Sequence, residues 1–182
     1  MMHWKYFIAL EKDLETISRY IELDPLNYFA FSTELSKIFL SSSSEINVVL
    51  KQICKKIEPD KICKNIDEYS DVIALNMPEF LNEFVYIERT SIELKPWKGW
   101  SRGNSPTWWG SYNKVKHERN LYYQKANLEN VLNAMAGLLI SVFYFQNLES
   151  GYDNNKNITR LLLPESTLMR LNENYYYSHL IV

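Results

Sequence analysis

The stretch LENVLNAMAGLLISVFYFQ, residues 128–146, carries apolar side chains at intervals of three and four residues, which is the spacing of one face of a helix. The members of this face are Leu128, Val131, Leu132, Met135, Leu138, Leu139, Val142 and Phe143. Asn127 comes directly before them, and its side-chain oxygen can cap the first turn of a helix. Because so wide an apolar face needs neighbours over much of its surface, we predict that these residues form the central helix of the core.

The N-terminal half of the chain repeats this spacing in two further segments. Residues 2–23 are predicted to form a helix that Pro25 ends. Residues 28–57 are predicted to form a longer helix, capped by Asn27 and continuing through the serine run 41–44. The inward positions are Phe7, Leu10, Leu14, Ile17 and Ile21 in the first helix, and Phe29, Leu35, Ile38, Phe39, Ile46, Leu50, Ile53 and Ile57 in the second.

The middle of the chain is less regular. Residues 60–83 predict short helical pieces around Pro78, and residues 84–95 predict at most a two-stranded ribbon. The alternating apolar residues of that ribbon are Val85, Ile87, Ile92 and Leu94. Because helical spacing dominates elsewhere, the predicted fold class is all-α, a single compact helical bundle with residues 28–57 and 128–147 as its longest elements.

Composition limits the classes of protein to which the chain can belong. Its 182 residues are the size of one ordinary domain, which we place at 1–149, with a polar loop and a C-terminal appendage at 150–182 packing on it. The 20 lysines and arginines nearly balance the 22 aspartates and glutamates, so any binding of nucleic acid must come from a local patch.

Cysteine usage and the N-terminal sequence bear on cofactors and location. Cys54 and Cys63 have no second cysteine pair and no histidine nearby, so we expect reduced thiols, no metal site and no cofactor. Lysine and glutamate interrupt every apolar run near the N-terminus, which predicts neither a signal peptide nor a membrane span. We therefore expect a cytoplasmic protein without a membrane partner.

The densest group of chemically active side chains lies in PTWWGSYNKVKHERN, residues 106–120. Ser105 followed by Pro106 is typical of a helix start, and we predict a helix from there to about Tyr122. Two faces separate on such a helix. The apolar face holds Trp108, Tyr112, Val115 and Tyr122, and the polar face holds Asn113, Lys116, His117 and Asn120.

The polar face carries groups that can act on a phosphodiester without a metal. An imidazole can transfer protons near neutral pH, a neighbouring cation can hold charge that develops on phosphorus, and RNA brings its own nucleophile, the 2′-hydroxyl. The alternative is structural, because a histidine among cations is usually solvated surface and paired tryptophans usually anchor a core. The loop 95–106 has the same two interpretations, since Trp97, Trp100 and Arg102 could stack on a base or fill the underside of a core.

The order of these elements resembles the HEPN superfamily, compact all-helical domains common in prokaryotic toxin–antitoxin and phage-defence systems. The features that carry the resemblance are two long N-terminal helices, an Asn-x-x-x-His step, and a strongly apolar helix with small residues at Ala134, Ala136 and Gly137. The phrase PTWWGSYNKVKHERNLYYQKANLENVLNAMAGLL, residues 106–139, is similar to a bacterial branch with a YNKVKH-x-R core, and RYIELDPLNYFAFSTEL, residues 19–35, adds a weaker likeness. In active members an arginine and a polar residue precede a histidine in a cleft between two subunits, where they support metal-independent cleavage of RNA.

The resemblance assigns roles to residues of this chain. His117 matches the histidine and Asn113 the polar residue, whereas Tyr112 stands at the position of the arginine. Lys116 and Arg119 lie within one turn and could replace the missing charge, although lysine lacks the bidentate fork of arginine. Some toxins of the superfamily carry a modified tyrosine two residues after the histidine; Arg119 occupies that position, which does not support regulation by this route.

Two functional hypotheses from different classes follow. In the first, the chain is a HEPN-like ribonuclease acting as a toxin or phage-defence effector, with His117 transferring protons in a cleft of a homodimer. Its supporting residues are Asn113, Lys116 and Arg119, and its candidate substrate contacts are Tyr112, Trp109, Asn120 and Arg102. RNA and a cognate antitoxin or defence-system protein are the expected partners. In the second, which Tyr112 favours, the chain is a catalytically inactive helical module that binds a protein or a nucleotide, so whether it is an enzyme stays open.

Overall fold

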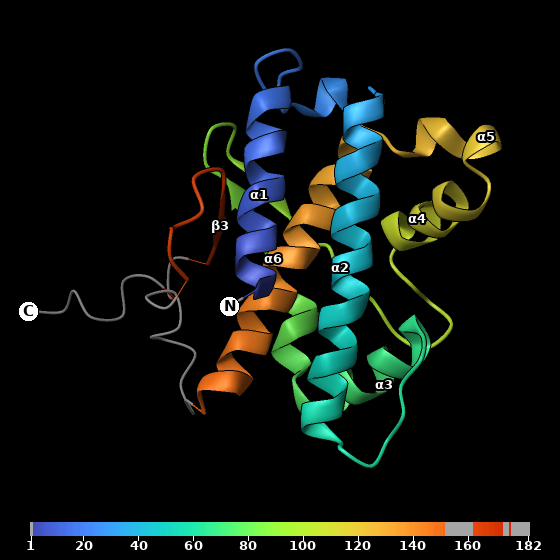
Figure 1. Ribbon diagram of the computed structural model, residues 1–182, viewed down its shortest axis with the longest axis vertical. Helices are drawn as coiled ribbons and strands as arrows, with labels where there is room; N and C mark the ends of the chain where they lie inside the picture. Colours follow the sequence, from blue (N-terminus) through green and yellow to red (C-terminus); the bar gives the residue numbers. More distant parts are fainter. Residues whose placement is uncertain (1, 152–161, 173–174, 176–182) are drawn as a thin grey trace, which may run out of the picture.

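Helix α6 (Leu128–Ser150) passes behind α1 (Met2–Ile17) and α2 (Thr33–Ile57) in the computed structural model, which describes residues 2–151, 162–172 and 175 (Figure 1). The Asn127 side chain accepts a hydrogen bond from the Asn130 N–H at 3.1 Å, which confirms the predicted cap. Gly151, with a φ of 64°, ends the helix in the left-handed region that favours glycine. The two longest helices are therefore the two that the apolar spacing predicts.

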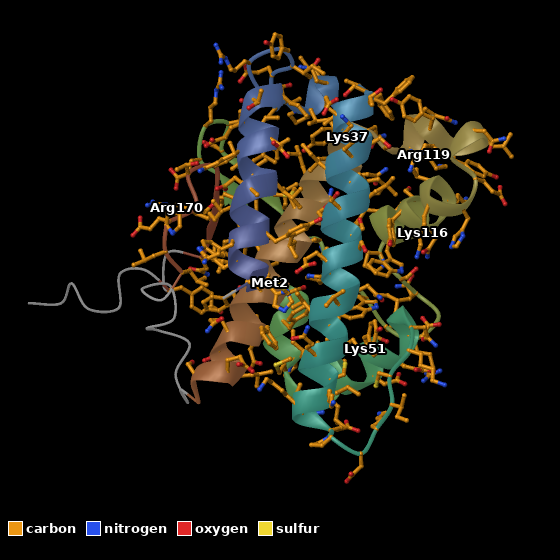
Figure 2. The ribbon with its side chains drawn as sticks, in the orientation of Figure 1. Met2, Lys37, Lys51, Lys116, Arg119 and Arg170 are labelled. Carbon is orange, nitrogen blue, oxygen red and sulfur yellow. The ribbon has the colours of Figure 1, made fainter. Side chains whose placement is uncertain are left out.

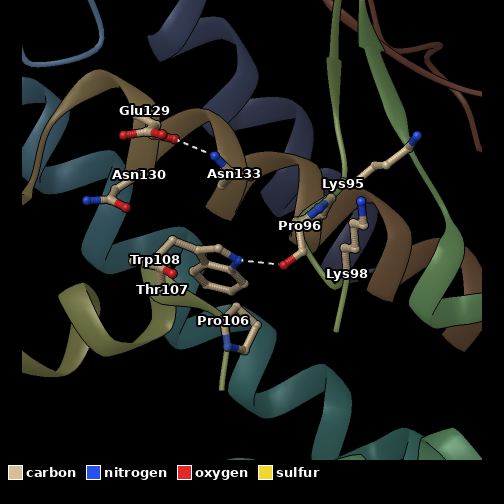
Figure 3. Close-up of a pocket in the computed structure, with 9 residues that line it drawn as sticks. All are labelled: Lys95, Pro96, Lys98, Pro106, Thr107, Trp108, Glu129, Asn130 and Asn133. Atoms are coloured by element: carbon tan, nitrogen blue, oxygen red, sulfur yellow. Dashed lines mark hydrogen bonds between the residues drawn. The ribbon is translucent and has the colours of Figure 1, made fainter. Parts of the chain in front are cut away.

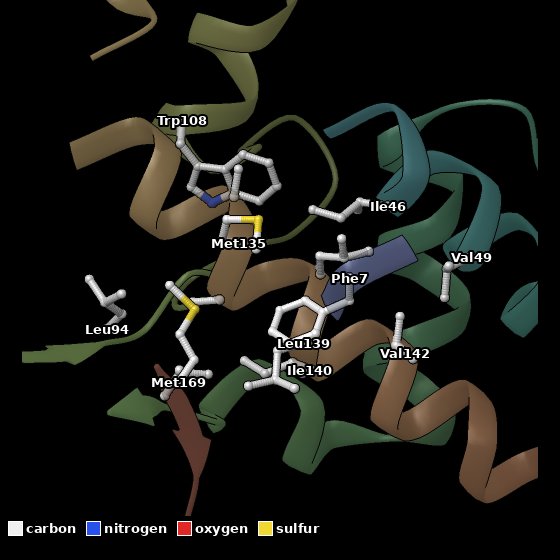
Figure 4. Packing of buried hydrophobic residues seen from close by; sticks show 14 of the residues in the cluster. Phe7, Ile46, Val49, Leu94, Trp108, Met135, Leu139, Ile140, Val142 and Met169 are labelled. Atoms are coloured by element: carbon white, nitrogen blue, oxygen red, sulfur yellow. The ribbon is translucent and has the colours of Figure 1, made fainter. Parts of the chain in front are cut away.

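Helix α6 is buried on nearly all sides along its first four turns. It is long and apolar enough to cross a membrane, but 83% of its most apolar window is buried inside the fold. The side chains around it come from α1, α2, α4 and the sheet, and Figure 4 shows Trp108, Phe7 and Met169 gathered along it. This burial is what the core helix of a soluble protein shows.

The start of α2 differs from the prediction. Ser32, not Asn27, caps the helix by accepting from the Leu35 N–H at 3.1 Å. Residues 28–31 hydrogen-bond to another helix, because the carbonyls of Tyr28 and Ala30 accept from the first N–H groups of α6. The serine run 41–44 is helical, as predicted, and its two central members are fully buried.

The first helix is shorter than predicted, ending at Ile17 rather than near residue 23. Directly after it, the Ser18 hydroxyl donates to the Glu15 carbonyl at 2.7 Å, a local bond that competes with helix continuation. The chain then forms a short 3-10 turn, η1 (Pro25–Asn27), which Asp24 caps by accepting from the Leu26 N–H.

A small sheet lies on the flank of α1, and it is larger than the predicted ribbon. After α3 (Ile66–Asn76) and the 3-10 turn η2 (Pro78–Asn82), strands β1 (Val85–Ile87) and β2 (Ile92–Leu94) pair antiparallel with Val85 opposite Leu94. Strand β3 (Met169–Leu171) pairs with the other edge of β1, so the order is β2-β1-β3. The prediction of at most two strands is wrong because β3 comes from the C-terminal segment, more than 70 residues from its partner.

The C-terminal segment docks on α1 through a buried carboxylate. Glu11 is 2% exposed and accepts from the backbone N–H groups of Thr167, Leu168 and Met169 at 3.1–3.2 Å, and also from the Ser166 hydroxyl. Burial raises the pKa of the Glu11 carboxyl, while these donors act in the opposite direction. The parts of the predicted appendage at 152–161, 173–174 and 176–182 lie outside the described residues.

Replacing Glu11 with alanine is expected to destabilise the docked segment. The buried Leu168 N–H would lose its acceptor, which costs about 1–3 kcal/mol, whereas the Met169 N–H keeps the Ser166 hydroxyl at 3.2 Å and Thr167 is exposed to water. We expect faster hydrogen exchange at Thr167, Leu168 and Met169, with exchange at the centre of α6 much less affected. Glu15→Ala is the matched control, because among the described residues of this segment Glu15 accepts from the Thr167 hydroxyl and from no backbone N–H; equal exchange in the two variants would contradict the role given to Glu11.

The loop before α4 (Thr107–His117) is pinned by aromatic packing. Trp97 and Trp100 are 0% and 2% exposed, with ring centroids 4.7 Å apart, and Trp97 also meets Trp108 at 5.2 Å. A Cβ at Gly137 would lie 3.3 Å from both Trp97 and Trp108, a tight contact that would push these rings away from α6 by a few tenths of an ångström. The loop tryptophans therefore fill the core, the structural one of the two interpretations above.

Candidate functional site

Helix α4 separates a buried face from an exposed one. Trp108, Trp109, Tyr112 and Val115 are at most 5% exposed and pack against α2 and α6, while Asn113, Lys116 and His117 are exposed. The apolar period of the sequence predicts this separation. The scaffold under the polar face is consequently rigid, and its polar side chains are accessible from solvent.

The exposed side chains have few partners within the protein. Among the residues that the structure describes, none hydrogen-bonds the side chains of Asn113 or His117, and no carboxylate pairs with Lys114, Lys116 or Arg119. Lys116 lies 5.5 Å from the ring centroid of Tyr112, and Lys114 the same distance from that of Tyr122. Figure 2 shows Lys116 and Arg119 on the flank formed by α4 and the short helix α5 (Arg119–Tyr122).

The predicted helix over 106–122 is broken near its middle. Helix α4 ends at His117, Glu118 leaves the helical region with φ −137° and ψ 51°, and the chain restarts as α5 and then the 3-10 turn η3 (Tyr123–Lys125). Asn120 therefore does not continue the row of Asn113, Lys116 and His117. No proline or glycine marks the break, so the sequence carries no signal for it.

The start of α4 also differs from the prediction. Pro106 is the capping residue and makes no side-chain cap, so Ser105 does not cap this helix.

The C-terminal end of α4 suits cations, because Lys114 and Lys116 lie in the last turn, where the helix dipole is negative. We call Asn113, Lys116, His117 and Arg119 the α4 polar face.

The remaining candidate substrate contacts are engaged in the fold. Trp109 packs at 5.6 Å from Trp108 and 5.2 Å from Tyr112, which leaves their rings little surface for a substrate. Arg102 binds Asp71 of α3, with its Nε 3.0 Å from one carboxylate oxygen. This hydrogen bond from Arg102 lowers the pKa of Asp71 and ties the loop to α3 instead of the α4 polar face.

Other reactive groups form contacts that the sequence did not predict. His3 of α1 pairs with Glu45 of α2 through Nδ1 at 2.5 Å, and Glu83 accepts from Tyr144 at 2.8 Å. The partners lie 42 positions apart in the first pair and 61 in the second, so no local sequence motif links them. Both cysteines are free and buried, and burial next to Cys63 raises the pKa of the Cys54 thiol to about 12, so this thiol stays protonated near neutral pH.

No described part of the chain gathers three or more histidine, cysteine, aspartate or glutamate side chains that could hold a metal ion. Comparisons with protein-family models, with curated proteins and with solved structures find no match to the chain. Membership of the HEPN superfamily therefore stays a prediction that rests on the motif residues of 106–139.

Proposed function

We propose that the chain is a metal-independent, HEPN-like endoribonuclease that acts in the cytoplasm as a toxin or phage-defence effector. The observation that carries this proposal is the α4 polar face, where His117 and Lys116 project from a helix whose opposite side is buried and Arg119 follows at the start of α5, neither cation having a carboxylate partner among the described residues. Side chains that are held on a packed helix and whose polar atoms have no partner within the protein are suited to bind a ligand. A cation without a carboxylate partner also keeps its charge for an anionic ligand.

The chemistry assigns each group a step. His117 takes the proton from a ribose 2′-hydroxyl, the 2′-oxygen bonds to phosphorus, and the bond from phosphorus to the 5′-oxygen breaks. The leaving 5′-oxygen takes a proton from water, which gives a 2′,3′-cyclic phosphate and a 5′-hydroxyl end. Lys116 and Arg119 stabilise the charge that builds on the phosphate oxygens, and Asn113 orients the imidazole or the substrate.

Two copies of the chain would supply what one copy lacks. The residue at the position of the motif arginine is Tyr112, which is 4% exposed and uncharged. A symmetric pair repeats the same surface on both sides of a twofold axis, so two α4 polar faces would place several cations around one phosphate. Their mutual repulsion would be relieved by an anionic ligand.

We expect RNA to favour this dimer. Light scattering at micromolar concentration should show a dimer fraction that rises when RNA is added and falls when salt is raised, because cation–phosphate contacts release counterions. Lys116→Ala should weaken both effects, whereas Lys51→Ala, which removes an exposed lysine of α2, should leave them unchanged. A strict monomer with and without RNA would contradict the shared cleft.

A second candidate function is a catalytically inactive module that binds a protein partner. The observation in its favour is a set of exposed apolar side chains, which lie on the segment that joins α1 to α2 and on α5. Its members and exposed fractions are Leu26 at 93%, Phe29 at 81%, Phe31 at 50% and Leu121 at 61%. Phe31 contacts Tyr123 of η3 at 5.6 Å, which links the two parts of this group. Exposed apolar side chains in one region are typical of an interaction surface.

One experiment separates the two candidates. Purified protein is incubated with total RNA in EDTA, alongside the His117→Ala and Lys51→Ala variants, and the fragments are tested for cyclic phosphate ends. The ribonuclease proposal expects fragments from the wild type and from Lys51→Ala only. Intact RNA in all three reactions, or equal cleavage by His117→Ala, would favour the binding module.

A further inference from the structure

A second polar surface lies at the opposite end of α4, where the helix begins. An open pocket of about 240 Å³ lies between the loop before α4, the first turn of α4 and the first two turns of α6 (Figure 3). It is lined by Lys95, Pro96, Lys98, Pro106, Thr107, Trp108, Glu129, Asn130 and Asn133. His117 is ten residues further along α4, about 15 Å away at the rise of a helix, so this pocket is separate from the α4 polar face.

The floor of the pocket is apolar and fixed. It contains the Pro106 ring and part of the Trp108 indole, whose N–H donates to the Pro96 carbonyl at 2.9 Å. That bond holds the indole in place and leaves the floor without a free donor of its own. A fixed apolar floor with an aromatic ring suits a flat, unsaturated group.

Two carboxamides of α6, those of Asn130 and Asn133, line the pocket. One N–H of Asn130 is used by the Lys125 carbonyl at 2.8 Å, and one N–H of Asn133 by the Glu129 carbonyl at 2.9 Å. Each amide therefore keeps one N–H donor and its carbonyl acceptor for a ligand. A neighbouring donor and acceptor are the pattern that adenine matches with its amino group and ring nitrogen, whereas guanine offers two acceptors on the corresponding edge.

The pocket also offers positive charge. Lys95 is paired with Glu93 at 2.6 Å, but Lys98 forms no ion pair with any described residue. The backbone N–H groups of Thr107 and Trp108 have no intrahelical acceptor and Pro106 supplies no side-chain cap for them, whereas the Trp109 N–H donates to the Pro106 carbonyl at 2.9 Å. A lysine beside uncapped N–H groups favours a phosphate. Glu129 adds a carboxylate that can accept hydrogen bonds from ribose hydroxyls.

We propose that this pocket binds an adenine nucleotide, with the base over the floor and against Asn130 and Asn133, and the phosphate at Lys98 and the start of α4. The pocket of about 240 Å³ is open on one side, so the base would lie inside it while the sugar and phosphate extend beyond its open side. The nucleotide can be a free mononucleotide or one nucleotide of a bound RNA strand. The assignment does not depend on catalysis at His117.

Titration calorimetry with AMP tests the assignment. AMP should bind with a stoichiometry of one per chain, and GMP about tenfold or more weakly, which is within the discrimination that amide pairing gives. Asn133→Ala should weaken AMP binding about tenfold by the same pairing. Asn76→Ala is the matched control, because Asn76 makes the same bond to a carbonyl four residues back but lies on α3. Lys98→Gln should remove the preference for AMP over adenosine.

Two kinds of result would overturn the AMP assignment, and competition with RNA identifies the source of the nucleotide. Absence of saturable AMP binding, or AMP binding that neither Asn133→Ala nor Lys98→Gln weakens, would overturn the assignment. His117→Ala should bind AMP like the wild type, so a failure of the ribonuclease proposal leaves this result intact. An adenine-containing RNA that displaces AMP and binds more tightly identifies the RNA strand as the source of the nucleotide, whereas AMP binding without competition identifies the free mononucleotide.

Discussion

Trp97→Ala is expected to lower the free energy of unfolding by about 3–5 kcal/mol, the usual cost of removing a large aromatic side chain from a core. Trp97 is fully buried and contacts Phe80, Trp100 and Trp108 with ring centroids 5.5, 4.7 and 5.2 Å away. Its removal would leave a cavity at the point where the loop 95–106, α4 and Gly137 of α6 meet. Domains are stable by only about 5–15 kcal/mol, so this change would consume much of the total.

Trp97→Phe provides the control for this prediction. The indole N–H of Trp97 is buried without an acceptor among the described residues, so phenylalanine removes an unsatisfied donor while keeping most of the ring. We expect a smaller loss than for Trp97→Ala, because the phenyl ring keeps part of the packing and leaves a smaller cavity. Urea unfolding followed by circular dichroism gives both values. Similar losses in the two variants would contradict the packing role of this ring.

His117→Ala is expected to reduce RNA cleavage by about 10²–10⁴-fold, the range that general acid–base groups contribute. His117 is exposed at the end of α4 and makes no hydrogen bond to a described residue through its side chain, so the variant should unfold at the same urea concentration as the wild type. The loss of activity would then reflect lost chemistry and not lost structure. A gel assay under single-turnover conditions gives the rate.

Added imidazole sharpens this test. Because the place of the missing side chain is open to solvent, a free imidazole can occupy it and restore part of the rate in His117→Ala. Lys116→Ala lacks a charge and not a proton-transfer group, so imidazole should not restore its rate. Restoration in neither variant, together with a rate loss below tenfold for His117→Ala, would count against proton transfer by His117.

The helices were predictable because their apolar period is local. Three or four residues separate the members of each apolar face, so α1, α2 and α6 could be placed from sequence spacing alone. Their exact starts were harder to predict. The apolar spacing predicts residues 28–31 as part of α2, but the carbonyls of Tyr28 and Ala30 bond to the start of α6, and only the folded chain brings these segments together.

The sheet shows the same limit more strongly. Strand β3 is three residues long, and it pairs with β1, which lies far from it in sequence. Its position depends on Glu11 of α1, which accepts from the residues leading into the strand. An isolated glutamate in an amphipathic helix is most simply a solvent-exposed residue, so this contact could not be expected from the sequence.

The candidate site was predictable in part. The spacing of Tyr112, Asn113 and His117 on one helix places the aromatic ring inside and the other two outside, as the structure has them. The break at Glu118 was not predictable, since no special residue causes it. Nor was the attachment of Arg102 to Asp71, because it depends on how a loop approaches α3.

The central claim is that the α4 polar face cleaves RNA through the 2′-hydroxyl of the substrate. A DNA oligonucleotide with a single ribonucleotide tests it most directly, because only one linkage in such a strand has that nucleophile. In EDTA, the wild-type protein should cut only on the 3′ side of the ribonucleotide and leave a 2′,3′-cyclic phosphate, and His117→Ala should not cut. To allow for base preference, the four possible ribonucleotides are tested in parallel. An intact strand in all four cases, or a cut at a deoxyribonucleotide, would contradict the account.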